Sequence, residues 1–96
     1  MTDNLVKLRI IGVTDHIIER VHNIDSETPL YDVLKEALKD WGDMIQKISD
    51  RIIKGTFILI INGLTIYRFS DIRDIKIKPG DEVAIMPVVF GGCKQL

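Results

Sequence analysis

The sequence has few of the residues on which metal-bound, disulfide-linked or nucleic-acid-binding domains depend. Its 96 residues include one cysteine, Cys93, so no disulfide can form within the chain and cysteine cannot build a structural zinc site. Thirteen basic residues stand against 14 acidic ones, for a net charge of -1. That balance provides no counterion-release drive toward DNA or RNA. We therefore expect no disulfide, no metal centre and no nucleic acid partner.

Long apolar runs are also missing. No uninterrupted apolar stretch approaches the length of about 18 residues that a membrane-spanning helix needs. Residues 1–4 are polar, unlike the start of a secretory signal. The sequence therefore predicts no membrane association and a cytoplasmic protein. With 46% hydrophobic residues, the composition is typical of one folded domain with a single core.

Motifs for catalysis are scarce. His16 and His22 share one face of a predicted strand but have no cysteine near them, so we favour ordinary surface histidines over a metal site. Residues 54–56 read Lys-Gly-Thr, without the glycine spacing of a phosphate-binding loop. No serine or cysteine stands in a nucleophile motif. We expect the chain not to be an enzyme and to bind no cofactor of its own.

Residues 1–90 are predicted to form one α+β domain, because strand and helix periods succeed one another along them. Two β-branched runs, at 5–13 and 16–24, predict a first hairpin. The period then becomes helical, with Thr28 placed as an N-cap and Gly42 as a C-terminal stop. The expected architecture is a mixed sheet with one main helix packed on one face.

The second half of the chain carries two turn signals. Residues 43–54 have a weaker helical pattern, which predicts a short helix or an ordered loop that could fold over the second face of the sheet. Asn62 and Gly63, between two apolar runs, predict a hairpin with a type I′ turn. Residues 78–81, Lys-Pro-Gly-Asp, predict a type II turn before a last strand at 82–90. The first and last strands would then lie side by side in parallel at the centre of the sheet.

A glycine pair, Gly91 and Gly92, follows the last strand. Glycine accepts backbone angles closed to other residues, so such a tail can enter a narrow channel. A chain ending at Gly92 would present its carboxylate to the α-phosphate of ATP in a partner enzyme, and the acyl-adenylate would be open to sulfur or to an amine. Ordering the tail costs about 1–2 kcal/mol per residue, which a docking face must offset. Phe57 and Leu59, in an uninterrupted apolar run, and Phe90 are candidates for that face.

Three segments together resemble the sulfur-carrier branch of the ubiquitin-like β-grasp family, in particular the small subunit of molybdopterin synthase. They are the Thr-Pro-Leu helix start, the strands around Asn62 and Gly63, and residues 80–92, Gly-Asp-Glu-Val-Ala-Ile-Met-Pro-Val-Val-Phe-Gly-Gly. The resemblance implies a β-grasp fold and a ubiquitin-activating-type adenylating enzyme that uses ATP to activate Gly92. It further implies that Gly92 becomes a thiocarboxylate with Gly91 as its flexible neighbour, and that the large subunit of the synthase receives the sulfur.

The chain departs from that pattern because it continues after Gly92 with Cys93, Lys94, Gln95 and Leu96. The domain is thus expected to be followed by a flexible tail at 91–96. An acyl group locked in an amide cannot be adenylated, so either a processing protease removes these four residues or the tail is not used in this way. A ubiquitin-like modifier joined to lysines through Gly92 and an interaction subunit without tail chemistry are the alternatives. Prenylation of Cys93 and a thioester formed by Cys93 are weaker ones.

Overall fold

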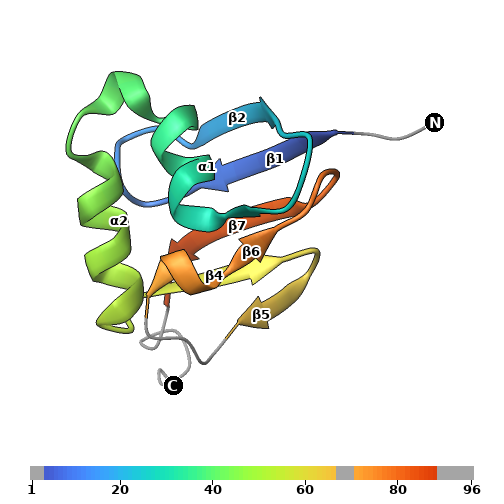
Figure 1. Cartoon of the computed structure of the whole chain (residues 1–96). Helices are drawn as coiled ribbons and strands as arrows, with labels where there is room; N and C mark the ends of the chain where they lie inside the picture. The colour runs from blue at the N-terminus through green and yellow to red at the C-terminus, as the bar shows by residue number, and fades with distance from the viewer. Residues whose placement is uncertain (1–3, 67–70, 89–96) are drawn as a thin grey trace.

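The computed structural model in Figure 1 describes residues 4–66 and 71–88. These residues form an α+β fold, in which a mixed sheet packs against helices. The strands are β1 (Leu5–Ile10), β2 (Ile18–Asn23), β3 (Thr28–Pro29), β4 (Phe57–Ile61), β5 (Leu64–Ile66), β6 (Lys76–Ile77) and β7 (Glu82–Pro87). The helices are α1 (Leu30–Ala37) and α2 (Met44–Ile53), with short 3₁₀ helices η1 (Lys39–Trp41) and η2 (Ile72–Asp74).

The main sheet has five strands in the order β2-β1-β7-β4-β5, and β3 pairs with β6 in a small second sheet. β1 and β7 run parallel, with Lys7 opposite Glu82 and Arg9 opposite Ala84. The other neighbouring pairs are antiparallel. The prediction that the first and last strands lie in parallel at the centre of the sheet is confirmed. β7 is therefore held on both sides, by β1 and by β4.

The alternation of side chains in β1 separates the two faces of the sheet. Val6, Leu8 and Ile10 are at most 2% exposed, and the residues between them face solvent. Because successive side chains of a strand point to opposite faces, one face of the sheet forms the core. The helices contribute Leu30, Val33, Leu34, Met44, Ile48 and Ile52 to this core, and β4 and β7 contribute Phe57, Leu59, Val83 and Ile85.

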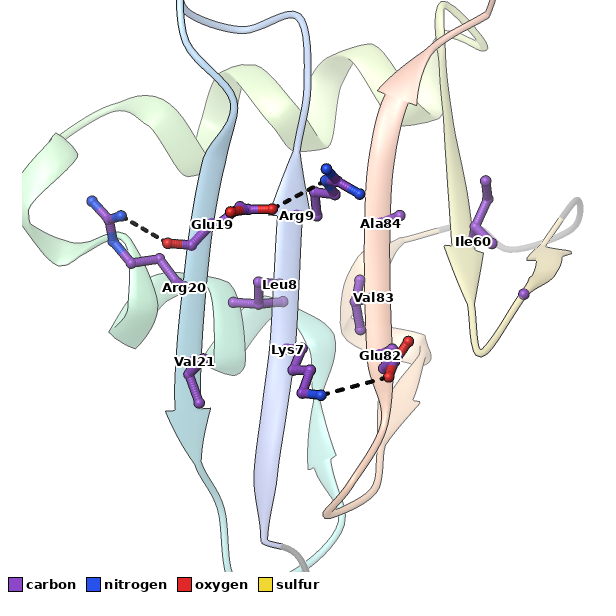
Figure 2. Close-up of a pocket in the computed structure, with 11 residues that line it drawn as sticks. Lys7, Leu8, Arg9, Glu19, Arg20, Val21, Ile60, Glu82, Val83 and Ala84 are labelled. Carbon is purple, nitrogen blue, oxygen red and sulfur yellow. Dashed lines mark hydrogen bonds and ion pairs between the residues drawn. The ribbon is translucent and has the colours of Figure 1, made fainter.

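Two helices cover this face of the sheet, where the sequence predicted one main helix. The main helix ends earlier than predicted, because α1 stops at Ala37 with Leu38 as its C-cap. Gly42, the expected stop, instead follows η1, at φ 60° and ψ -110°. Residues 43–54 then form α2, whose buried Met44, Ile48 and Ile52 share one side of the helix. That side packs on β4 and near α1, in the same core. α2 therefore extends the covered face and does not fold over the second face, as Figure 2 shows with both helices behind the sheet.

The start of α1 differs from the prediction. Pro29, at φ -58° and ψ 141°, precedes the helix, and no side chain caps it. The hydroxyl of Thr28, the expected N-cap, donates instead to the carbonyl of Ser26 at 2.9 Å. The N–H of Leu30 donates to the carbonyl of Ile75 at 2.7 Å. Backbone bonding to the segment at β6 thus satisfies a donor of the first turn that a capping side chain would otherwise have taken.

Both predicted turns are present, and a single side chain joins them. Asn62 at φ 52° and Gly63 at φ 83° have the left-handed conformation that a type I′ turn requires, and Gly80 at φ 91° fits a type II turn. The Nδ2 of Asn62 donates to Oδ1 of Asp81 at 2.9 Å, and its Oδ1 accepts the N–H of Glu82 at 2.9 Å. We call these contacts the Asn62 clamp. The clamp ties the β4–β5 hairpin to the start of β7.

Candidate functional site

The second face of the main sheet is the candidate surface, and we call it the open face. Figure 2 views it from the side without helices. The strand registers place Glu19, Arg9, Ala84 and Ile60 in one row across four strands. The open face is defined by Lys7 and Arg9 of β1, Glu19 and Val21 of β2, Ile58 and Ile60 of β4, and Glu82, Ala84 and Met86 of β7.

An apolar strip crosses the open face over β4 and β7. Ile58 pairs with Met86 and Ile60 with Ala84. All four side chains are half-buried, although both helices lie on the other side of the sheet. Contiguous apolar surface that no element covers is typical of an interaction site. The uninterrupted apolar sequence of β4 therefore serves two faces, with Leu59 in the core and its neighbours in the strip.

Ion pairs border the apolar strip on the side of β1. Nζ of Lys7 lies 3.9 Å from Oε2 of Glu82, and Nε of Arg9 lies 3.2 Å from Oε2 of Glu19. All four side chains are more than half exposed, so each pair contributes about 0–1 kcal/mol to stability. A shallow depression of about 540 Å³ lies over these strands. An apolar centre with a charged border is the usual anatomy of a protein–protein interface.

The C-terminal end of β7 is held by backbone contacts with both neighbouring segments of the chain. Pro87 lies opposite Phe57 in the register of β4 and β7. The N–H of Val88, the last described residue, donates to the carbonyl of Thr56 at 2.9 Å. On the other side of β7, the N–H of Ile11 donates to the carbonyl of Ile85 at 2.8 Å. The backbone is thus held from two directions where the sequence approaches its glycine pair.

Phe57 and Leu59, which the sequence suggested as docking residues, lie on the covered face. Their side chains are 7% and 0% exposed and belong to the core, so they present no surface to a partner. The correction is a shift by one residue, to Ile58 and Ile60, whose side chains point the other way.

The residues predicted to carry the chemistry, Gly91 and Gly92, lie outside the described residues, as does Phe90. Their proposed roles therefore stay predictions. The structure places β7, the strand that precedes them in the sequence, in the middle of the sheet. β7 also contributes to the open face, which the sequence predicted at the neighbouring apolar run but assigned to Phe57 and Leu59.

Other polar clusters contribute little to a site. In residues 4–66 and 71–88, no three His, Cys, Asp or Glu side chains come together where they could hold a metal ion, and no helix there is long and apolar enough to cross a membrane. Asp71 accepts the N–H of Arg73 at 2.9 Å and pairs with its guanidinium at 3.0 Å. That backbone hydrogen bond and the nearby positive charge lower the pKa of Asp71 from its ordinary value of 3.8. This pair closes η2 and lies away from the open face.

Comparison of the chain with family models, with curated proteins and with solved structures gave no match.

Proposed function

We propose that this chain is a sulfur-carrier protein of the ubiquitin-like β-grasp type, which works with its C-terminus trimmed to Gly92. Two features of the fold support this proposal. The strand order β2-β1-β7-β4-β5, with β1 and β7 parallel at the centre, is the order expected of a β-grasp sheet. The helices between the two hairpins pack on one face of that sheet. The proposal places the protein in the cytoplasm, with an ATP-dependent adenylating enzyme as its partner.

The observation that carries the proposal is that β7, the strand that precedes the glycine pair in the sequence, is central and forms part of an apolar face that neither described helix covers. β7 ends at Pro87, and the chain from Pro87 to Gly92 can span at most about 17 Å. A partner that binds the open face would hold β7 and would have the acyl end within that reach. β7 would thereby both contact the partner through the open face and bring Gly92 close to the partner's active site.

The chemistry requires only a free main-chain carboxylate from this protein. A carboxylate oxygen of Gly92 attacks the α-phosphorus of ATP, the bond between the α-phosphorus and the bridging oxygen breaks, and pyrophosphate leaves. Sulfide, as HS⁻, then attacks the acyl carbon, the acyl–phosphate bond breaks, and AMP leaves; loss of the sulfur proton leaves Gly92 as a thiocarboxylate. The amide between Gly92 and Cys93 must be hydrolysed first, because only the free carboxylate of Gly92 has an anionic oxygen that can attack phosphorus. A processing protease is therefore part of the proposal.

The open face must supply enough affinity to offset the ordering of the arm. Fixing four residues, 89–92, costs about 4–8 kcal/mol at about 1–2 kcal/mol per residue. At about 25 cal/mol per Å² of apolar surface, this corresponds to about 160–320 Å² of buried area. An interface of ordinary size buries about 800 Å² per partner. A partner that covers the strip around Ile58 and Ile60 can meet this requirement.

The test is ATP–pyrophosphate exchange with ubiquitin-activating-type enzymes encoded by the same genome. The chain ending at Gly92 is expected to stimulate exchange with one of them, and the chain ending at Leu96 is not. Ile60→Asp in the trimmed chain should raise the KM for the carrier, because it places a charge in the apolar strip. The proposal would be refuted if the trimmed chain stimulated exchange with none of these enzymes.

A second candidate is an interaction subunit that makes no chemical use of its tail. The open face favours this candidate, because docking through it needs no residue beyond Val88. Gly92→Ala and deletion of residues 93–96 would then leave cellular function unchanged. A ubiquitin-like modifier shares the activation step but leaves its C-terminus in branched peptides on lysines of other proteins. Mass spectrometry of tryptic digests separates that product from a free carrier.

A further inference from the structure

Gly12, in the loop between β1 and β2, packs against the end of β7 more closely than any other residue type would allow. A Cβ added to Gly12 would lie 2.6 Å from Cγ of Pro87 and 3.0 Å from its Cδ. The ring of Phe57 would be the next neighbour, with Cζ at 3.5 Å. Gly12 also has φ 89°, a conformation that glycine adopts readily. Two independent features, the contact and the backbone angle, therefore require glycine here.

A second loop holds the end of β7 from the side of β4. Thr56 accepts the N–H of Val88 at 2.9 Å through its carbonyl. The N–H of Thr56 in turn donates to the carbonyl of Arg51 at 3.0 Å, at the end of α2, and the guanidinium of Arg51 lies 5.4 Å from the centre of the Phe57 ring. We call Gly12, Thr56, Phe57 and Pro87 the exit collar. The collar contacts the end of β7 from two sides, with Gly12 in the loop after β1 on one side and Thr56 and Phe57, at the start of β4, on the other.

We propose that the exit collar positions the C-terminal arm for delivery and that Gly12 is its positioning residue. This inference rests on the proposed carrier function. An arm that starts from a fixed base occupies a restricted volume relative to the open face, so docking brings Gly92 toward one place on the partner. A methyl group on Gly12 must move Pro87 by about 1 Å to reach ordinary contact distance. Misplacement on that scale can cost about a hundredfold in rate for a reaction that depends on positioning.

The first test observes the arm directly and needs no partner. A nitroxide on Cys93, the one cysteine in the sequence, broadens the backbone amide signals of residues that the arm approaches. Gly12→Ala should change the pattern of broadening around the collar. Gly42→Ala is the matched control, because Gly42 also has a positive φ, 60°, but an added Cβ would meet nothing within 4 Å. Broadening patterns that are the same in wild type and Gly12→Ala would overturn the proposal.

Pro87→Ala provides the second variant, which adds no backbone strain at Gly12. It removes Cγ and Cδ, the atoms that the new methyl group would meet. Gly12→Ala should therefore change the broadening less in the Pro87→Ala background than in the wild type. If the change is equal in the two backgrounds, the contact with Pro87 does not set the path of the arm. If Gly12→Ala alone does not fold, Pro87→Ala by itself is compared with the wild type, and an unchanged broadening pattern would then overturn the proposal.

The kinetic test uses the chain ending at Gly92 with an enzyme that it stimulates. Gly12→Ala should lower kcat for adenylation about tenfold or more and leave KM unchanged, because the open face still docks. Gly42→Ala should leave both values near those of the wild type. A higher KM with unchanged kcat would contradict a positioning role for Gly12. If no enzyme is stimulated at all, the carrier function fails, and the nitroxide result still decides whether the collar directs the arm.

Discussion

Replacing Asn62 by aspartate tests how the two turns hold the start of β7. The amide of Asn62 has a defined orientation, because its Oδ1 accepts the N–H of Glu82 and its Nδ2 donates to Asp81 at 2.9 Å. In Asn62→Asp the first bond survives and the second becomes a contact between two carboxylates. Aspartate also tolerates the left-handed conformation at φ 52°, so the backbone is little affected. The variant thus changes one of the two side-chain hydrogen bonds of the Asn62 clamp and leaves the other in place.

The expected loss of stability has two parts. The lost hydrogen bond contributes about 0.5–1.5 kcal/mol. Two charges 2.9 Å apart repel each other by about 1.4 kcal/mol even at the dielectric constant of water. The free energy of unfolding should therefore fall by about 2–3 kcal/mol at pH 7. Repulsion raises the pKa of the pair above the ordinary value of about 3.9 for aspartate.

The sign of the pH dependence follows from that raised pKa. Protonation of one carboxyl removes the repulsion and restores a hydrogen-bond donor. The loss of unfolding free energy is therefore smallest below about pH 3.9, and it grows as the pH rises through the raised folded pKa. Urea unfolding at pH 7 and pH 3, compared with wild type and with Asn62→Ala, measures the difference. Asn62→Ala should show a penalty that depends little on pH. An Asn62→Asp penalty equal at both pH values would refute this account of the clamp.

Two further predictions concern the faces of the sheet and the charge at η2. Leu59→Ala should lower the free energy of unfolding by about 2–5 kcal/mol. Ile60→Ala should lower it by less and should weaken binding of the activating enzyme. Equal losses of stability in urea unfolding would contradict the assignment of the two residues to opposite faces. The carboxyl of Asp71 should titrate below 3.8 by NMR, and its bond to Arg73 should add stability that is present above pH 3.8 and is lost as the pH falls through the folded pKa. The prediction would be contradicted if the pKa of Asp71 were 3.8 in the wild type and the same in Arg73→Ala.

The sequence predicted both turns from local patterns, and it predicted the central parallel pair from the order of the elements, a hairpin, a helix and a second hairpin. The strict alternation in β1 and the residues Asn62 and Gly63 carry their own structural signals. The covered face of β4 could not be predicted in the same way, since an uninterrupted apolar run has no period of two. Phe57 and Ile58 are equally apolar, and only the position of α2 decides which of them is buried. Thr28 failed as a cap for a related reason, because its segment pairs with β6, which is distant in the sequence.

The collar around β7 had no sequence signal at all. The contact of Gly12 with Pro87 joins residues near opposite ends of the sequence. Such a contact arises from the parallel pairing of β1 with β7, which brings the loop after β1 beside the end of β7. Tertiary topology, not local propensity, therefore creates the site from which the arm leaves.

The most direct measurement is the intact mass of the protein isolated from its native cells. The carrier account predicts chains that end at Gly92, a fraction of them with one sulfur in place of one oxygen at the C-terminus. Mild reduction and alkylation should label that fraction, because a thiocarboxylate reacts as a sulfur nucleophile and residue Cys93 is no longer present. A population that consists only of chains extending through Leu96 would contradict the account.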